Sequence, residues 1–298
     1  MKKTRLLLTL ASIIFFTSCK MADVRTDYML SKEGSADLEK KGRQILSASI
    51  EAMGYDKLDA IESYETTAKF DWRFPWSSMP LNSLPGAKGN DIQFKFKPNS
   101  FDGQVEYLEG RKKGDIHGLQ SWKTYRLDDE NKPEYTKDKR RSWGLSSYHY
   151  MLEGPYRLIN ADIVTYAGVK EFEGQKYDLV FVSWETEDPH KEHDQWLLYI
   201  NQKTKFVDLA NLTIRDFFLP FPPNMAEGTV RYLDRVKTSA GIHLPSDMVI
   251  QLMAPKKEKK HVYRITFKDY KFDSFPQDVL QPFDGLKDFE DSKPTHSK

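Results

Sequence analysis

Apolar and polar residues alternate strictly between positions 64 and 74, and positions 92–96 repeat the pattern. A period of two places all the apolar side chains on one face of a β-strand, so we expect two amphipathic strands here. Because their aromatic side chains would share one face, we expect that face to point to the concave side of a sheet. There it would meet a helix or line a cavity. The aromatic residues concerned are Phe70, Trp72, Phe74, Phe94 and Phe96.

A helical period precedes the first of these strands. Ser35 is a suitable N-cap, Gly54 is a suitable stop, and the residues between them carry one apolar stripe. The stripe consists of Leu38, Ile45, Leu46 and Met53, with Ser49 among them. We therefore expect one amphipathic helix of about 18 residues before the first strand.

Most of the remaining chain is typical of further strands. Ten of the fourteen residues of 128–141 are charged, which favours a solvated loop. A short helix is expected over 142–152, ended by Gly154-Pro155. The stretches 179–182 and 196–199 are apolar at every position, so we expect both faces of these strands to be covered. The further strands are expected near 101–109, 118–127, 177–185, 195–201, 204–216, 228–238, 246–254 and 260–272.

Ten or eleven strands joined by short turns, with few helices, indicate one large antiparallel sheet. So many strands seldom form a flat open sheet, because strand twist makes them curl. The sequence therefore predicts an α+β fold: a strongly curved antiparallel sheet whose concave face is covered by the N-terminal helix and a few short helices.

Composition excludes several classes of protein. The chain has 45 basic and 44 acidic residues, interspersed, so its charge gives no reason to expect nucleic-acid binding. A single cysteine rules out an intramolecular disulfide and a multi-cysteine zinc site.

The first residues have the layout of a secretory signal. Three basic residues within positions 2–5 are followed by eleven uncharged residues, 6–16, and then by Thr17-Ser18-Cys19. Such an apolar run is too short to cross a bilayer, which needs about 20 residues. The alternatives are an ordinary signal peptide with an incidental cysteine, or a buried cysteine in a cytosolic helix.

Phe16-Thr17-Ser18-Cys19 resembles a bacterial lipobox, although Phe16 stands where leucine is commonest. The resemblance implies cleavage before Cys19 and attachment of a diacylglycerol, usually with an amide-linked acyl chain. We therefore expect a signal peptide at 1–18, a polar tether at 19–34, one domain at 35–290 and a polar tail at 291–298. The protein would be exported and held by its lipid in the bacterial cell envelope, at the outer membrane.

Two apolar loops interrupt this pattern. Fourteen uncharged residues, 74–87, include Trp76, and ten more, 217–226, begin with Phe217 and Phe218. Loops normally lie on the surface, so a strongly apolar loop indicates a packed lid or an interaction patch. One interpretation is that both loops bury themselves over the ends of the sheet. The other is that they form the mouth of a cavity, or touch a membrane or a partner.

Motifs for enzymatic chemistry are missing from the sequence. It has no nucleophile elbow, no glycine-rich nucleotide fingerprint, no phosphate loop and no metalloprotease motif, so we expect no catalytic residues and no cofactor.

His190 and His193 could ligate a metal with Asp188 or Asp194 nearby. However, their segment joins two apolar strands and contains Pro189, which favours an exposed hairpin loop without a metal.

The order of these elements resembles the LolA/LolB lipoprotein-carrier superfamily. The lipobox and N-terminal helix are followed by Gly54-Tyr55-Asp56-Lys57-Leu58 and an aromatic strand, and Trp196–Thr204 is similar to a strand and turn of LolA-like domains. Gly241–Pro245 and Phe267–Phe272 fit the closing hairpin of that superfamily. The resemblance implies an unclosed β-barrel, closed over by helices, that encloses an apolar cavity for acyl chains.

Two functions follow from these expectations. The first is a non-enzymatic, membrane-anchored lipoprotein that binds a lipid or another hydrophobic small molecule, with the aromatic residues of 70–76 and 94–96 and Phe217 and Phe218 at the cavity or its mouth. The alternative is a structural or interaction subunit of an envelope complex, its core filled by its own side chains. The size of the cavity distinguishes the two, because an acyl-binding site needs roughly 300 Å³ or more.

Overall fold

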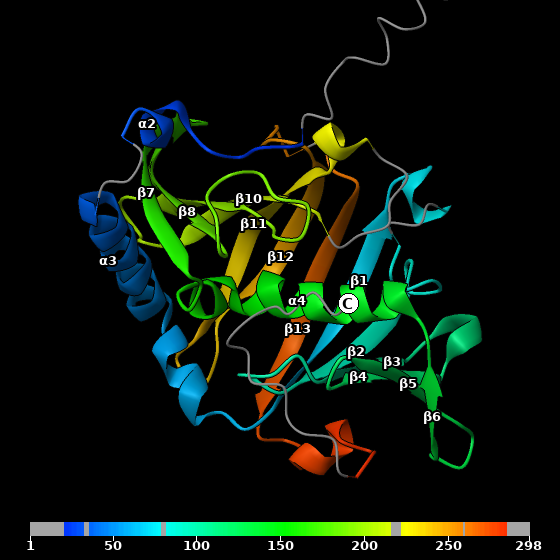
Figure 1. Cartoon of the computed structure of the whole chain (residues 1–298). Coiled ribbons are helices and arrows are strands. Elements are labelled where there is room, and N and C mark those ends of the chain that lie inside the picture. Colours follow the sequence, from blue (N-terminus) through cyan, green and yellow to red (C-terminus); the bar gives the residue numbers. More distant parts are fainter. Residues whose placement is uncertain (1–20, 33–35, 79–81, 216–221, 259, 285–298) are drawn as a thin grey trace, which may run out of the picture.

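The computed structural model describes residues 21–32, 36–78, 82–215, 222–258 and 260–284. Thirteen strands of this part form one sheet in the order β6-β5-β4-β3-β2-β1-β13-β12-β11-β10-β9-β8-β7, and neighbouring strands are antiparallel. The strands are β1 (Tyr64–Trp72), β2 (Asp91–Phe96), β3 (Gly103–Tyr107), β4 (Ile116–Gln120), β5 (Lys123–Leu127), β6 (Pro133–Thr136), β7 (Ile163–Phe172), β8 (Gln175–Ser183), β9 (Trp196–Asn201), β10 (Val207–Thr213), β11 (Glu227–Lys237), β12 (His243–Leu252) and β13 (Tyr263–Phe272). The sheet curls without closing, which confirms the predicted fold class (Figure 1).

Three α-helices of the described residues accompany the sheet: α2 (Asp27–Leu30), α3 (Ala36–Met53) and α4 (Lys139–Leu158). None of the helices among the described residues is both long and apolar enough to span a membrane. Short 3₁₀ turns lie between them and the strands. They are η1 (Tyr55–Ala60), η2 (Trp76–Ser78), η3 (Gly110–Lys112), η4 (Pro223–Met225) and η5 (Gln277–Leu280).

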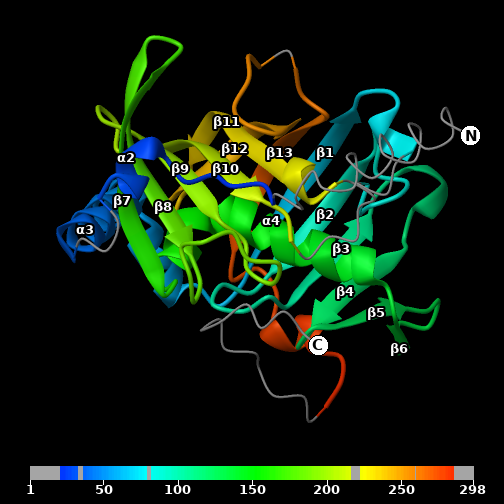
Figure 2. The same ribbon diagram turned by 45° about the horizontal axis from the view of Figure 1, so that its top comes forward.

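The predicted N-terminal helix, α3, lies beside the edge strand β7 and not over the middle of the sheet (Figure 1). Gly42 makes this approach possible, because a Cβ at this position would lie 2.7 Å from the backbone of Thr165. The helix that crosses the concave face is α4, as both views show (Figures 1 and 2). The expectation that α3 covers the concave aromatic residues was therefore wrong.

The aromatic face predicted for β1 and β2 packs against α4. Phe70, Phe94 and Phe96 are fully buried, and the ring of Tyr148 in α4 lies 4.9 Å from that of Phe94. Offset and tilted aromatic contacts of this kind stabilise a core beyond the area they bury. Under β1–β3 the concave side is therefore filled by side chains.

Residues 21–30 cover the opposite face of the sheet. Val24 and Met29 are buried against the outward side chains of β7–β10, such as Leu179 and Leu197. The alternate residues of the same strands, such as Val180 and Leu198, belong to the core on the concave side. Both faces of these strands are thus covered, as predicted. Part of the stretch expected to be a free tether, 19–34, instead packs on the domain, because its few apolar residues complete this second core.

The sheet has more strands than the sequence suggested. The stretch 118–127 contains two strands, β4 and β5, joined by a tight turn in which Ser121 and Trp122 both have positive φ. Asn-Gly or Asp-Gly usually marks such turns, so this one escaped recognition. The charged stretch 128–141 is not entirely loop, since β6 and the start of α4 lie within it. Strand β7 was not predicted.

Helix α4 continues through Gly154-Pro155 to Leu158, although a break was expected there. Proline has no N–H, so it cannot donate to the carbonyl four residues earlier, that of Met151. The hydroxyl of Tyr232 in β11 donates to this carbonyl at 2.8 Å, and the hydroxyl of Tyr55 donates to the next one, of Leu152, at 2.9 Å. Tertiary hydrogen bonds thus compensate for the proline.

Candidate functional site

A cavity of about 770 Å³ lies between α4 and the concave side of β9–β13. This volume is within the range of roughly 300–1,000 Å³ that is usual for small-molecule sites. Helix α4 separates the cavity from the packed aromatic core. Leu145, Tyr148 and Leu152 contribute to the core, whereas Trp143, Tyr150 and their neighbours on the adjacent helix face line the cavity.

The wall of the cavity is mainly apolar and rich in aromatic residues. Four of the six tryptophans of the chain take part, together with three tyrosines and seven aliphatic residues. These residues are Trp122, Trp143, Trp184, Trp196, Tyr135, Tyr150, Tyr263, Met151, Leu212, Ile214, Val230, Ile250, Leu252 and Val262. Such a wall suits a hydrocarbon chain, since it offers few hydrogen bonds and a large contact area.

Gly228 helps to keep the site hollow. It pairs with Leu212 on β10 and with Leu252 on β12, so a side chain at this position would share their face of the sheet. Both leucines line the cavity, as does Gly228 itself. A Cβ at Gly228 would meet no atom closer than 3.4 Å. A larger residue would therefore extend into the space.

The end of the cavity near β5, β6 and the start of α4 is basic. Lys123, Lys137 and Lys139 lie there, and none of them forms an ion pair with a carboxylate of the described residues. The two acidic side chains of the wall are engaged elsewhere: Asp138 caps α4 by accepting from the Arg141 amide at 3.0 Å, and Asp194 accepts from the Arg215 amide at 2.7 Å. A mostly apolar pocket thus has a cationic end.

Of the residues predicted for the ligand site, those that the structure describes are not in the wall of this cavity. Phe70, Phe94 and Phe96 are buried in the packed core. Trp72 comes nearest, since its ring stacks at 4.1 Å on that of Tyr263, which does line the cavity. The sequence pattern located the concave face correctly but could not tell its filled half from its hollow half.

The apolar loop 74–87 has two different parts. Phe74 is 86% exposed, whereas Leu84 and Ala87 are buried, and Trp76 is half-buried against the core. The buried part agrees with a packed lid, and the exposed part agrees with an interaction patch. Phe217 and Phe218, like Cys19, lie outside the described residues.

A buried polar network on α4 was not predicted. His149, Glu153 and Arg157 follow one another at intervals of four residues, so they lie on one stripe of the helix. Arg157 Nε donates to Glu153 Oε2 at 2.7 Å, and the Tyr64 hydroxyl donates to Oε1 at 2.6 Å. Burial is the largest single effect and would raise the pKa of Glu153. The charge of Arg157, together with His149 and the hydrogen bond from Tyr64, outweighs burial and holds this pKa below its usual value. Burial also lowers the pKa of His149.

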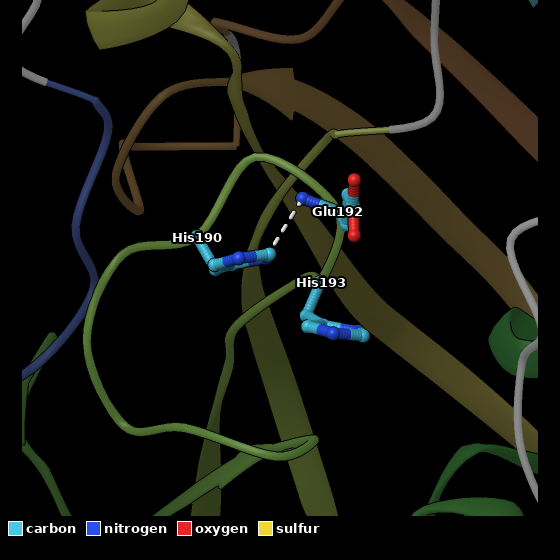
Figure 3. Close-up of side chains that lie close together, drawn as sticks. All are labelled: His190, Glu192 and His193. Atoms are coloured by element: carbon cyan, nitrogen blue, oxygen red, sulfur yellow. Dashed lines mark hydrogen bonds between the residues drawn. The ribbon is translucent and has the colours of Figure 1, made fainter.

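His190, Glu192 and His193 lie close together in the connection between β8 and β9 (Figure 3). Atoms that could ligate a metal are all within 4.8 Å of one another. However, Nδ1 of His190 accepts a hydrogen bond from the Glu192 amide at 3.1 Å, and Nε2 of His193 lies 3.2 Å from Glu185. One nitrogen of each imidazole is thus engaged within the loop itself, and a loop without a metal stays our prediction.

Comparison with solved structures identifies the class of fold. A LolA superfamily protein from Nitrosomonas europaea superposes with a TM-score of 0.50 at 11% identity, covering 79% of this chain and 96% of that one. A DUF1329 family protein from Desulfovibrio piger gives a TM-score of 0.46 at 8% identity, covering 81% and 96%. No protein-family model matches the sequence, and no curated protein matches it either. The chain has a LolA-like fold.

Proposed function

We propose that this protein is an exported lipoprotein that holds the hydrocarbon part of a lipid in the cavity between α4 and the sheet, without enzymatic activity. The observation that carries the proposal is the cavity itself, about 770 Å³ in volume with an aromatic and aliphatic wall. Solidly packed interiors contain few voids larger than a water molecule, so a hollow of this size favours an occupant. The lipobox-like sequence at Cys19 supports attachment to the outer membrane.

The basic end of the cavity narrows the choice of ligand. An acyl chain with a carboxylate or phosphate head would place the head beside Lys123, Lys137 and Lys139 and its chain among the tryptophans. Lysine is a common partner of such groups. A fatty acid or an acidic phospholipid therefore fits this site better than a neutral sterol does.

The alternative is a structural subunit whose core is filled by its own side chains. Only one half of the concave side of the sheet is filled in this way. Under β1–β3 the interior is filled by Phe70, Phe94, Phe96 and Tyr148. Under β9–β13 the interior contains the cavity of about 770 Å³. The ligand-binding function accounts for both halves.

Organic extraction of the purified protein, followed by mass spectrometry, tests the proposal. We expect a lipid in addition to the covalent anchor, at close to one molecule per protein chain. The Gly228→Phe variant should yield much less, because its side chain occupies the cavity. Equal amounts of lipid from both proteins would refute the assignment of this cavity.

A further inference from the structure

We propose that one rim of the sheet, where β1 and β12 end and β11 begins, lies against the bilayer that holds the lipid anchor. This inference rests on the proposed anchoring at Cys19 and adds to it the orientation of the domain. This side of the sheet is at the top of Figure 1. Its exposed apolar and basic residues, which we call the anchor rim, are Phe74, Met225, Met253, Lys256, Lys257 and Lys260.

The N-terminal segment is fixed beside this rim. The amide of Ala22 donates to the carbonyl of Pro223 at 2.9 Å, and the guanidinium of Arg215 donates to the carbonyl of Ala22. Two residues later, the amide of Val24 donates to Gln195 Oε1 at 3.2 Å. Ala22 and Val24 are also buried, so this part of the chain is held by the domain.

Little chain remains between this attachment and the lipid. Cys19 and Ala22 are three residues apart, and three extended residues span at most about 11 Å. The diacylglycerol would therefore start within about 11 Å of Ala22, which is itself bonded to Pro223 in η4. A free tether of sixteen residues, as first expected for 19–34, would leave the domain free to turn. The attachment at Ala22 instead brings one rim to the membrane.

The chemistry of the rim fits a lipid surface. Phe74, Met225 and Met253 are 86%, 44% and 37% exposed, although large apolar side chains are usually buried. They flank strands at one side of the sheet: Phe74 follows β1, Met225 precedes β11 and Met253 follows β12. The Met253 amide donates to the Glu227 carbonyl of β11 at 2.8 Å, and β13 lies between β1 and β12 and pairs with both.

Basic residues accompany the exposed apolar ones. Lys256, Lys257 and Lys260, with Glu258 among them, lie in the connection between β12 and β13. Apolar side chains that enter the interface, with lysines beside them for acidic headgroups, are typical of peripheral membrane contacts.

This orientation also brings the cavity near the bilayer. Ile214, Leu252 and Val262, which line the cavity, lie at the ends of β10, β12 and β13 that form this side of the sheet. A lipid would then pass between the membrane and the cavity without crossing a wide aqueous gap.

Strand β11 offers a matched pair of positions for the test. Met225 precedes the strand and Val236 lies near its far end, and both are exposed, by 44% and 40%. They are eleven positions apart, most of them along β11, so up to about 36 Å separates them. In the lipidated mature protein the thiol of Cys19 would be blocked, so a label would attach only to the cysteine of Met225→Cys or Val236→Cys. Each labelled protein is placed in vesicles of phosphatidylethanolamine and phosphatidylglycerol (3:1) that contain a nitroxide lipid.

We expect the nitroxide to quench a fluorophore at position 225 several times more than one at position 236. A label at Met253→Cys should behave like the one at 225. Equal quenching at 225 and 236, or stronger quenching at 236, would overturn the orientation. The mass of the same preparations separates the two proposals: a diacylglycerol on Cys19 without preferential quenching leaves anchoring intact, whereas an unmodified Cys19 removes the basis of both.

Discussion

The hydroxyl of Tyr232 donates a hydrogen bond to the carbonyl of Met151 at 2.8 Å, and this carbonyl is the one that Pro155 deprives of its helical donor. Strand β11 thereby stabilises the middle of α4. Since α4 forms one wall of the cavity, the hydrogen bond also positions that wall over the sheet.

Tyr232→Phe should lower the free energy of unfolding by about 1–2 kcal/mol, because it leaves the Met151 carbonyl without this donor. In a Pro155→Ala background the same change should cost clearly less, since the new amide of residue 155 can donate to Met151. Urea denaturation of the two single variants and the double variant measures the difference. Equal costs in both backgrounds would mean that Tyr232 does not compensate for the proline.

The ion pair of Glu153 and Arg157 is expected to be costly to break. Both side chains have no exposed surface, so Glu153→Gln leaves a buried guanidinium without its carboxylate. We expect a loss of about 3 kcal/mol in the free energy of unfolding. Glu134→Gln breaks the exposed pair with Arg126 and serves as the control, with a loss of less than about 1 kcal/mol. Similar losses for the two variants would contradict a special role of the buried network.

Stability should fall as the pH is lowered from about 6.5 towards 4. Burial lowers the pKa of His117 from 6.5 to about 4, and burial also lowers that of His149. In this window the unfolded chain binds protons that the folded chain does not, so the free energy of unfolding decreases with falling pH. His117→Gln should reduce this slope and change stability little at pH 7.5. Denaturation curves at several pH values test this, and a slope identical to that of the wild type would refute it.

More of the fold than of the candidate site could be predicted from the sequence. Alternation along β1 and β2 identified a buried aromatic face, and the uniformly apolar stretches of β8 and β9 revealed strands covered on both sides. These features depend on residues close in sequence, so their periodicity is visible locally. Strand β7 was missed although it is rich in β-branched and aromatic residues. The turn at Ser121-Trp122 was missed because it contains neither the asparagine nor the glycine that usually marks such turns.

The site depends on relationships that no local pattern contains. Whether the concave face is filled or hollow is decided by where α4 crosses it, and the length of α4 depends on a hydroxyl from Tyr232, 81 residues away. The only local signal for the cavity wall was the concentration of Tyr and Trp in 142–152. The sequence predicts a helix for this stretch, but no sequence pattern indicates which strands the helix faces. The role of Gly228 could not be predicted from sequence, because it depends on the cross-strand pairing with Leu212 and Leu252.

Lipid attachment is tested by Cys19→Ser. We expect wild-type protein to partition with membranes and to carry the mass of a diacylglycerol on Cys19. The variant should remain uncleaved or become soluble, and it should lack this mass. Two or more acyl chains hold a protein firmly where one is marginal, so the difference in partitioning should be large. A wild-type mature protein with an unmodified Cys19 would contradict anchoring.

Quenching of tryptophan fluorescence by a brominated fatty acid tests the central claim most directly. Four of the six tryptophans line the cavity, so a bound chain with bromine along it lies against them. We predict strong, saturable quenching in delipidated wild-type protein and little in Gly228→Phe. Ala68→Phe is the control, because Ala68 lies in the packed core; it should retain quenching while losing about 1–3 kcal/mol of stability through overpacking. Quenching that fails to saturate, or that is equal in wild type and Gly228→Phe, would contradict a ligand in this cavity.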